Sequence, residues 1–166
     1  TLTQLEVGSV VRVGVTYTDG QGSGESVSSA ATGSVVNVND APSGSVTISG
    51  TAVEDGVLAA ANTLSDEDVL GTISYTWSNG DIGATTTLGQ ADVGLAITVT
   101  ATYTDGQGSG ESVSSAATGS VANVNDAPIG SVTISGTATE DQTLTAVTGT
   151  IADEDGLGSF SYQWKR

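Results

Sequence analysis

The chain has 166 residues, with 19 Asp and Glu against 3 Lys and Arg, so its formal net charge is −16. So large a negative charge makes nucleic acid and anionic membrane surfaces poor partners, because both attract basic patches. The chain has no Cys and no His, which excludes structural zinc sites, thiol nucleophiles and histidine-based catalysis. We therefore expect a protein that is not an enzyme and whose acidic groups are neutralised by cations.

The sequence also lacks the usual signs of membrane insertion. No stretch reaches the roughly 18 consecutive apolar residues that a membrane span requires, and no basic-then-apolar leader stands at the start. We expect a soluble chain with no direct membrane insertion, held together by apolar burial and by metal rather than by disulfides.

A repeat of about 86 residues organises the chain. Residues 17–35, YTDGQGSGESVSSAATGSV, recur unchanged at 103–121, and NVNDAP recurs with the same offset. A one-residue insertion then shifts the alignment of the repeats, so that Trp77 is aligned with Trp164. Self-similarity at a fixed period indicates an array of units. We predict the C-terminal part of a first repeat at 1–40, a complete repeat at 41–126 and the N-terminal part of a third repeat at 127–166.

Within the complete repeat, apolar and polar residues alternate with period two, which is typical of strands. We predict strands near 44–51, 57–64, 71–78, 83–88, 95–104 and 111–124, of which the last contains a bulge or splits in two. Six or seven short strands in under 90 residues favour an immunoglobulin-like sandwich. The inward faces of the third and fifth strands should form the core: Ile73, Tyr75 and Trp77, and Leu95, Ile97, Val99, Ala101 and Tyr103. We interpret Trp77 and Trp164 as core anchors rather than as sugar-stacking residues.

The acidic residues of the repeat cluster in the connections between strands, and successive connections alternate between the two ends of a sandwich. Stacked repeats would therefore bring acidic residues of two neighbouring repeats together at each joint between repeats, near 37–40 for the first joint and 123–126 for the second. At the second joint we expect Glu54, Asp55, Asp92, Asn125, Asp126, Asp153 and Asp155. At the first joint we expect the smaller set Glu6, Asn39, Asp40, Asp66 and Asp68. Calcium takes six to eight oxygen ligands, so both sets predict calcium sites.

Plainer interpretations remain for two motifs. The segment NDAP is also what a proline-stopped turn with solvated loop charges would contain. The segment TDGQGSGE, at 18–25 and 104–111, lacks the spacing of a calcium-roll repeat, and we expect a flexible hairpin loop there.

A family resemblance rests on these same motifs. NVNDAP at each joint resembles the cadherin linker motif, and DED some 26 to 28 residues downstream stands where cadherins carry Asp-Ala-Asp ligands. Glu54 resembles the early cadherin glutamate. The order NDAP, ISGTA, EDG, SYTW and YTDGQG is similar to the cadherin-like repeats of giant bacterial adhesins exported by type I secretion, the RTX adhesins. The first linker aspartate of cadherins is replaced by Asn37 and Asn123, which leaves one or two calcium ions per joint.

The resemblance implies all-β, tandem immunoglobulin/cadherin-like Greek-key β-sandwich repeats, located extracellularly on a bacterial cell surface or secreted. It implies calcium-rigidified extender repeats in the stalk of an adhesin that supports cell-surface or biofilm adhesion. The alternatives are a polysaccharide-binding module of a secreted degradative enzyme, which would need exposed aromatic residues, and a carboxylate-pair hydrolase, which would need a cleft. The expected partners are neighbouring repeats of the same protein and, through the incomplete repeats at 1–40 and 127–166, head-to-tail copies of the chain.

Overall fold

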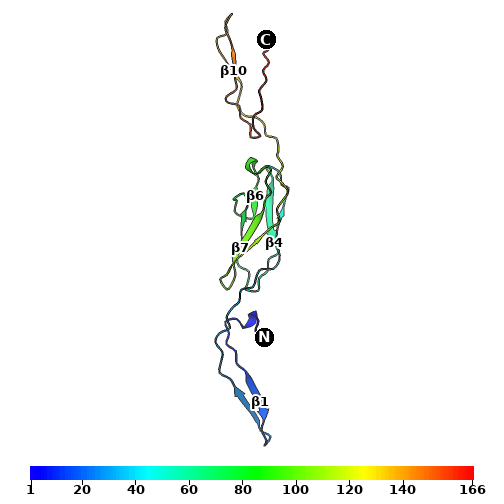
Figure 1. The fold of residues 1–166 in the computed structure, drawn as a ribbon, viewed down its shortest axis with the longest axis vertical. Helices are drawn as coiled ribbons and strands as arrows, with labels where there is room; N and C mark the ends of the chain where they lie inside the picture. The colour runs from blue at the N-terminus through cyan, green and yellow to red at the C-terminus, as the bar shows by residue number, and fades with distance from the viewer.

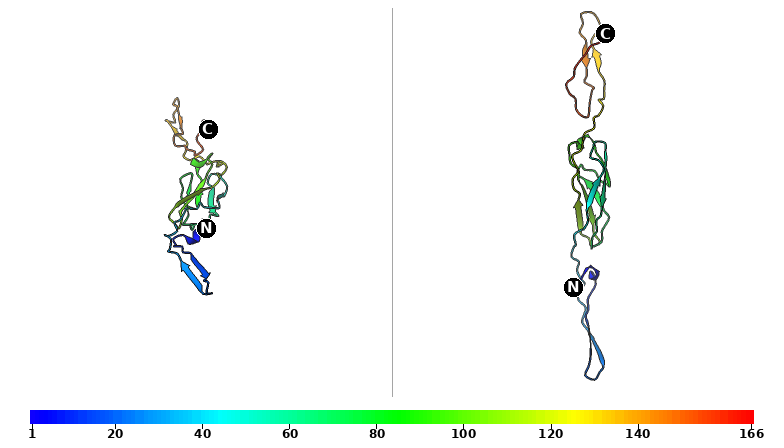
Figure 2. Two further views of the ribbon diagram at one scale, coloured as in Figure 1. Left: turned by 60° about the horizontal axis from the view of Figure 1, so that its bottom comes forward. Right: turned by 90° about the vertical axis from the view of Figure 1, so that its right-hand side faces the viewer.

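The computed structural model describes all residues from 1 to 166. The chain forms three units strung along one axis, with a compact central unit between two thinner terminal segments (Figures 1 and 2). All regular sheets are antiparallel. The helices are two three-residue 3-10 turns, η1 (Gln4–Glu6) and η2 (Gln90–Asp92). Neither turn is a candidate for crossing a membrane.

The central unit contains two three-stranded sheets. One sheet has the order β3-β4-β6, with β3 at Val46–Ser49, β4 at Val57–Asn62 and β6 at Thr85–Thr87. The other has the order β5-β7-β8, with β5 at Ser74–Trp77, β7 at Val99–Thr104 and β8 at Gly110–Ser114. These are the six expected strands in shortened form. The last one splits, because β8 ends at Ser114 and the chain pairs again only through bridges at 120–122.

The facing sides of both sheets build one apolar core. Trp77, Leu58 and Val99 are at most 2% exposed, and Ile73 and Tyr75 pack against this core from its edge. The prediction for Leu95 is wrong, because this side chain is 51% exposed. Its backbone N–H donates to the carbonyl of Asp92, so Leu95 belongs to the turn after η2 and lies outside the alternation of β7.

The terminal segments each carry a single hairpin. In 1–40 it is formed by β1 (Gly14–Thr18) and β2 (Gly24–Ser28). In 127–166 it is formed by β9 (Thr133–Ser135) and β10 (Thr145–Val147). Residues 161–164 correspond to β5 of the central unit but form no strand. The reason is a missing partner: the neighbouring strand of β5 in its sheet is β7, and residues 127–166 contain no counterpart of β7.

Candidate cation sites at the linkers

We call Asn37–Asp40 the first linker and Asn123–Asp126 the second linker. Each linker is fixed to the unit that follows it by a backbone hydrogen bond to a carboxylate. The N–H of Asp40 donates to Oδ2 of Asp68 at 2.9 Å, and the N–H of Asp126 donates to Oδ2 of Asp155 at 2.8 Å. Asp68 and Asp155 are counterparts in the repeat, so the same contact is built twice.

The two DED turns, at 66–68 and 153–155, hold these carboxylates with the same internal hydrogen bond. The N–H of Asp68 donates to Oδ1 of Asp66 at 2.9 Å, and the N–H of Asp155 donates to Oδ1 of Asp153 at 3.0 Å. These are bonds from residue i+2 back to an Asp side chain, the Asx-turn pattern. Each turn therefore points its third residue at the linker.

A side-chain amide donates to the second oxygen of each linker-binding carboxylate. Gln4 Nε2 donates to Oδ1 of Asp68 at 2.8 Å, and Asn123 Nδ2 donates to Oδ1 of Asp155 at 2.7 Å. The hydrogen bond from the Asp126 N–H, assisted by Asn123, lowers the pKa of Asp155 below its ordinary value. This carboxylate is therefore held in the charged form that a cation requires.

Three carboxylates converge beside the first linker. Oxygen atoms of Asp66, Asp68 and Asp105 lie within 4.8 Å of one another. Oδ1 of Asp105 accepts hydrogen bonds from the N–H groups of Gln107 and Ser109, each at 2.8 Å. Oδ2 of Asp105 is buried and has no hydrogen-bond partner. A buried carboxylate oxygen without a donor is costly, and a bound cation would satisfy it.

The Tyr103 hydroxyl supports this group from the end of β7. It donates to Oδ2 of Asp66 at 2.6 Å. Burial raises the pKa of the Tyr103 phenol above its ordinary value, and the hydrogen bond to Asp66 raises it further. The neutral phenol thus acts as a fixed donor that orients Asp66.

A second group of carboxylates lies at the other end of the central unit. Oxygen atoms of Glu54, Asp126 and Asp155 lie within 4.8 Å of one another. Glu54 is 4% exposed, and its Oε2 accepts the N–H of Val124 at 3.0 Å. Glu54 comes from the unit before the linker and Asp155 from the unit after it. A cation bound here would join both units to the linker.

The two groups are complementary views of one repeated site, because Asp68 and Asp155 are counterparts. At the first linker, all three carboxylates come from the unit that follows the linker. At the second linker, the group also includes Glu54 from the unit that precedes it. Like charges this close repel one another, and a bound cation would offset that repulsion. The residues fit a hard divalent cation, since every converging side chain is a carboxylate and calcium prefers oxygen ligands.

Several predicted ligands have other hydrogen-bonding roles in the structure. Glu6 accepts from the N–H and hydroxyl of Thr3, and Asp92 accepts from the N–H of Gly89, so both cap their own 3-10 turns. Asn39 donates to Glu111 at 2.8 Å, and Asn125 donates to the carbonyl of Asp126 at 2.9 Å. Asp55 is an exposed turn residue with φ of 58°. The carboxylates of Glu6, Asp55 and Asp92 belong to neither of the two converging groups.

Sequence reasoning placed Asp105 at the same end of the sandwich as Asp66 and Asp68 but left it out of the predicted ligands, and the structure shows it to be 5% exposed. It belongs to the TDGQGSGE segment that we expected to be only a flexible loop. The signal was the position of this aspartate directly after β7, at the same end of the unit as Asp66 and Asp68. No family model, no curated protein and no solved structure matches the chain.

Proposed function

We propose that the chain consists of calcium-rigidified extender repeats from the stalk of an extracellular bacterial adhesin. The units would be immunoglobulin/cadherin-like Greek-key sandwiches of the type I-secreted (RTX) kind, serving cell-surface or biofilm adhesion. One observation carries this proposal: Oδ2 of Asp105 is buried without a donor, in a carboxylate whose oxygens converge with those of Asp66 and Asp68 where the linker arrives. Calcium bound there supplies the missing electrostatic partner.

The chemistry of the linkers favours a mechanical role. Each linker already contacts the following unit through a backbone N–H, at Asp68 or Asp155. A cation held by Glu54, Asp126 and Asp155 would add contacts on both sides of the second linker. Bending would then require the loss of metal–oxygen bonds. The end-to-end arrangement of the three units is the geometry that a stalk needs (Figure 2).

The polysaccharide-binding alternative has weaker support. Sugar-binding modules present aromatic rings to solvent, but Trp77 and Tyr103 of the central unit are 2% and 6% exposed. The exposed aromatic residues lie in the terminal segments, and Trp164 and Tyr17 are the counterparts of those two buried residues. Their exposure follows from the absence of a facing sheet, which gives no reason to assign them to a sugar.

The test is a calcium titration of the 166-residue chain by calorimetry, paired with small-angle scattering at the same calcium concentrations. We expect saturable binding together with a narrower distribution of end-to-end distances. Magnesium is the matched control, because it demands a tighter octahedral geometry and dehydrates reluctantly. The proposal fails if calcium produces neither heat beyond dilution nor a change in the scattering profile.

A further inference from the structure

The side chain of Gln90 lies against the carboxylate of Glu54, one of the three acids that converge at the second linker. Its amide group is 2.5 Å from Oε1 and 3.1 Å from Oε2 of Glu54. Both oxygens of an ionised Glu can only accept, so the amide turns its NH2 group toward them and donates. Gln90 begins η2, and Glu54 lies in the connection between β3 and β4. The contact is therefore formed entirely within the central unit.

This contact compensates for the burial of Glu54. The residue is 4% exposed, and its Oε2 also accepts the N–H of Val124 at 3.0 Å. A buried carboxylate requires donors or a cation, because water no longer solvates it. Val124 supplies a backbone donor and Gln90 a side-chain donor. The donors of the protein thus occupy the oxygens that a cation at the second linker would share, whereas Oδ2 of Asp105 has no such partner.

The corresponding glutamine at the first linker also contacts a candidate ligand. Gln4 is the counterpart of Gln90 in the repeat and begins η1. Its Nε2 donates to Oδ1 of Asp68 at 2.8 Å. Asp68 belongs to the unit after the first linker, whereas Glu54 belongs to the unit before the second. The same position of the repeat therefore places an amide against one of the converging carboxylates at both linkers.

An amide can serve such a site in two states. Glutamine carries an acceptor oxygen and a donor NH2 group on the same carbon, and rotation about its last torsion exchanges them without other movement. Calcium accepts glutamine carbonyl oxygens as well as carboxylates. A cation beside Glu54 would repel the NH2 group of Gln90 and attract its oxygen. Cation binding would therefore reverse the orientation of the amide that is favoured without metal.

We propose that Gln90 donates to Glu54 while the second linker holds no metal, and turns its amide oxygen to a divalent cation when one binds. This inference rests on the calcium site of the proposed function. It adds to that site a neutral ligand and a side chain that takes the place of the cation when the cation is absent. Glu54 can then stay buried in both states, so a cation meets a carboxylate that is already in position.

The direct test is NMR of the Gln90 side-chain amide in the 166-residue chain, in chelator and in saturating calcium. Gln90→Leu identifies its resonances. In chelator the NH2 protons should exchange slowly with water, because they are bonded to Glu54. In calcium that bond is broken, so exchange should become faster by about threefold or more. Equal exchange rates in the two solutions overturn the proposal.

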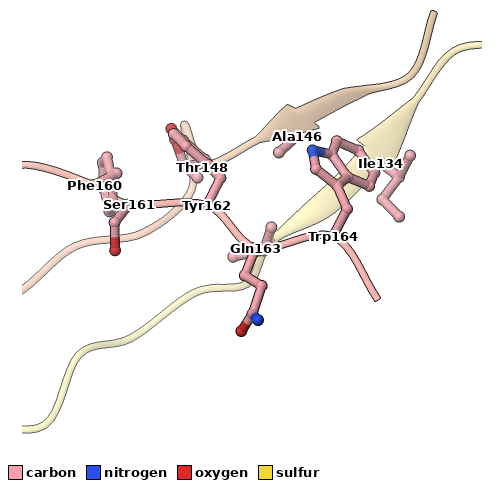
Figure 3. A pocket seen from close by; sticks show the side chains of 9 residues that line it. Ile134, Ala146, Thr148, Phe160, Ser161, Tyr162, Gln163 and Trp164 are labelled. Atoms are coloured by element: carbon pink, nitrogen blue, oxygen red, sulfur yellow. The ribbon is translucent and has the colours of Figure 1, made fainter. Parts of the chain in front are cut away.

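Gln163 provides the internal reference for this measurement. Its side chain is exposed, and its amide points away from Trp164 and Ile134 (Figure 3). The NH2 protons of Gln163 should exchange quickly in both solutions. A change at Gln163 equal to that at Gln90 would show an effect of calcium on the whole chain, and would contradict a specific turn of the Gln90 amide.

Urea unfolding in chelator tests the donor role alone. Gln90→Leu removes the side-chain donor of Glu54, so the equilibrium constant for unfolding should rise by about tenfold. Gln107→Leu is the matched control, because it makes the same change at an exposed side chain of the same unit. Equal stability of Gln90→Leu and Gln107→Leu contradicts the donor role.

Calorimetry with calcium tests the ligand role. Gln90→Glu places a carboxylate oxygen where the amide oxygen would bind, so calcium affinity should rise by about threefold or more. The same variant should be less stable than the wild-type chain in chelator, because two carboxylates then face each other. Ala91→Glu is the matched control, since it adds the same charge at the next, exposed residue. Equal gains in affinity for the two variants contradict the ligand role.

The outcomes for the wild-type chain separate this inference from the proposed function. Calcium binding seen by calorimetry, with no change at the Gln90 amide, overturns the inference and leaves the proposed function standing. The absence of any calcium binding overturns both, because the amide then has no cation to turn toward.

Discussion

The backbone N–H of Asp126 donates to the carboxylate of Asp155 at 2.8 Å, and this bond connects the second linker to the unit that follows it. The bond needs the side chain of Asp155 but only the backbone of Asp126. The two residues therefore separate two sources of stiffness. One is the direct hydrogen bond, and the other is any cation held by both carboxylates and Glu54.

Asp155→Ala and Asp126→Ala should thus loosen the second linker under different conditions. Asp155→Ala removes the acceptor of the linker N–H, so we expect a broader distance distribution in calcium and in chelator alike. Asp126→Ala keeps that bond, so the distribution should broaden in calcium only. Small-angle scattering at concentrations where the chain is monomeric measures both effects.

Glu25→Ala serves as the control for these variants. Glu25 lies in β2, in the hairpin of the N-terminal segment, and its removal changes net charge by the same amount. The scattering of Glu25→Ala should match the wild-type chain in both solutions. Identical curves for Asp155→Ala and the wild-type chain would show that the linker bond does not limit bending.

Asp105→Asn should change stability in opposite directions with and without calcium. The amide keeps an oxygen that can accept from Gln107 and Ser109 but removes one of three converging charges. In chelator the repulsion with Asp66 and Asp68 falls, so the melting temperature should rise. In calcium a ligand charge is lost, so the increase in melting temperature on adding calcium should shrink.

Asp19→Asn is the matched control for Asp105→Asn, because it lies in the same sequence, TDGQGSGE, but outside the two carboxylate groups. Measured at dilution, it should leave the calcium response unchanged. If Asp105→Asn lowers the melting temperature in chelator, the repulsion argument is wrong.

Calcium removal should destabilise the wild-type chain, because an unfolded chain has no comparable site. At free calcium near 100 times the dissociation constant, linkage gives about 2.7 kcal/mol per site. Thermal unfolding in millimolar calcium and in chelator measures this difference. Equal melting temperatures in the two solutions would contradict calcium binding at the linkers.

Much of the fold could be predicted because the sequence repeats. The period predicted the units, and the alternation of Ile97, Val99 and Ala101 predicted a buried face that the structure confirms. Leu95 could not be assigned this way, because a turn bonded to Asp92 interrupts the alternation. Residues 161–164 are the counterparts of β5, and they form no strand because they lack a partner such as β7. Alternation alone does not reveal whether that partner is present.

The candidate site was predictable in its location but not in its details. Sorting loops to the ends of the sandwich brought Glu54, Asp126 and Asp155 to one linker, as the structure shows. Loop position does not distinguish a carboxylate that converges with others from one that caps a 3-10 turn. Glu6 and Asp92 cap such turns, and for this reason they were included among the predicted ligands. Asp105 was left out of the predicted ligands because burial of a glycine-rich loop residue depends on tertiary contacts.

Tyr103 should make stability sensitive to alkaline pH. Its pKa is raised in the folded chain from an ordinary value of 10.0, first by burial and then by the hydrogen bond to Asp66. A raised pKa means that the unfolded state loses the phenol proton first. The stabilisation is therefore complete below pH 10 and falls as the pH rises above it.

Urea unfolding of the wild-type chain and of Tyr103→Phe, from pH 8 to 11, isolates this residue from the other tyrosines. We expect Tyr103→Phe to be less stable at pH 8, because Asp66 loses a donor, and to lose less stability toward pH 11. Parallel pH profiles for the two chains would show that the phenol does not titrate with unfolding, and would remove the hydroxyl of Tyr103 as the group that orients Asp66.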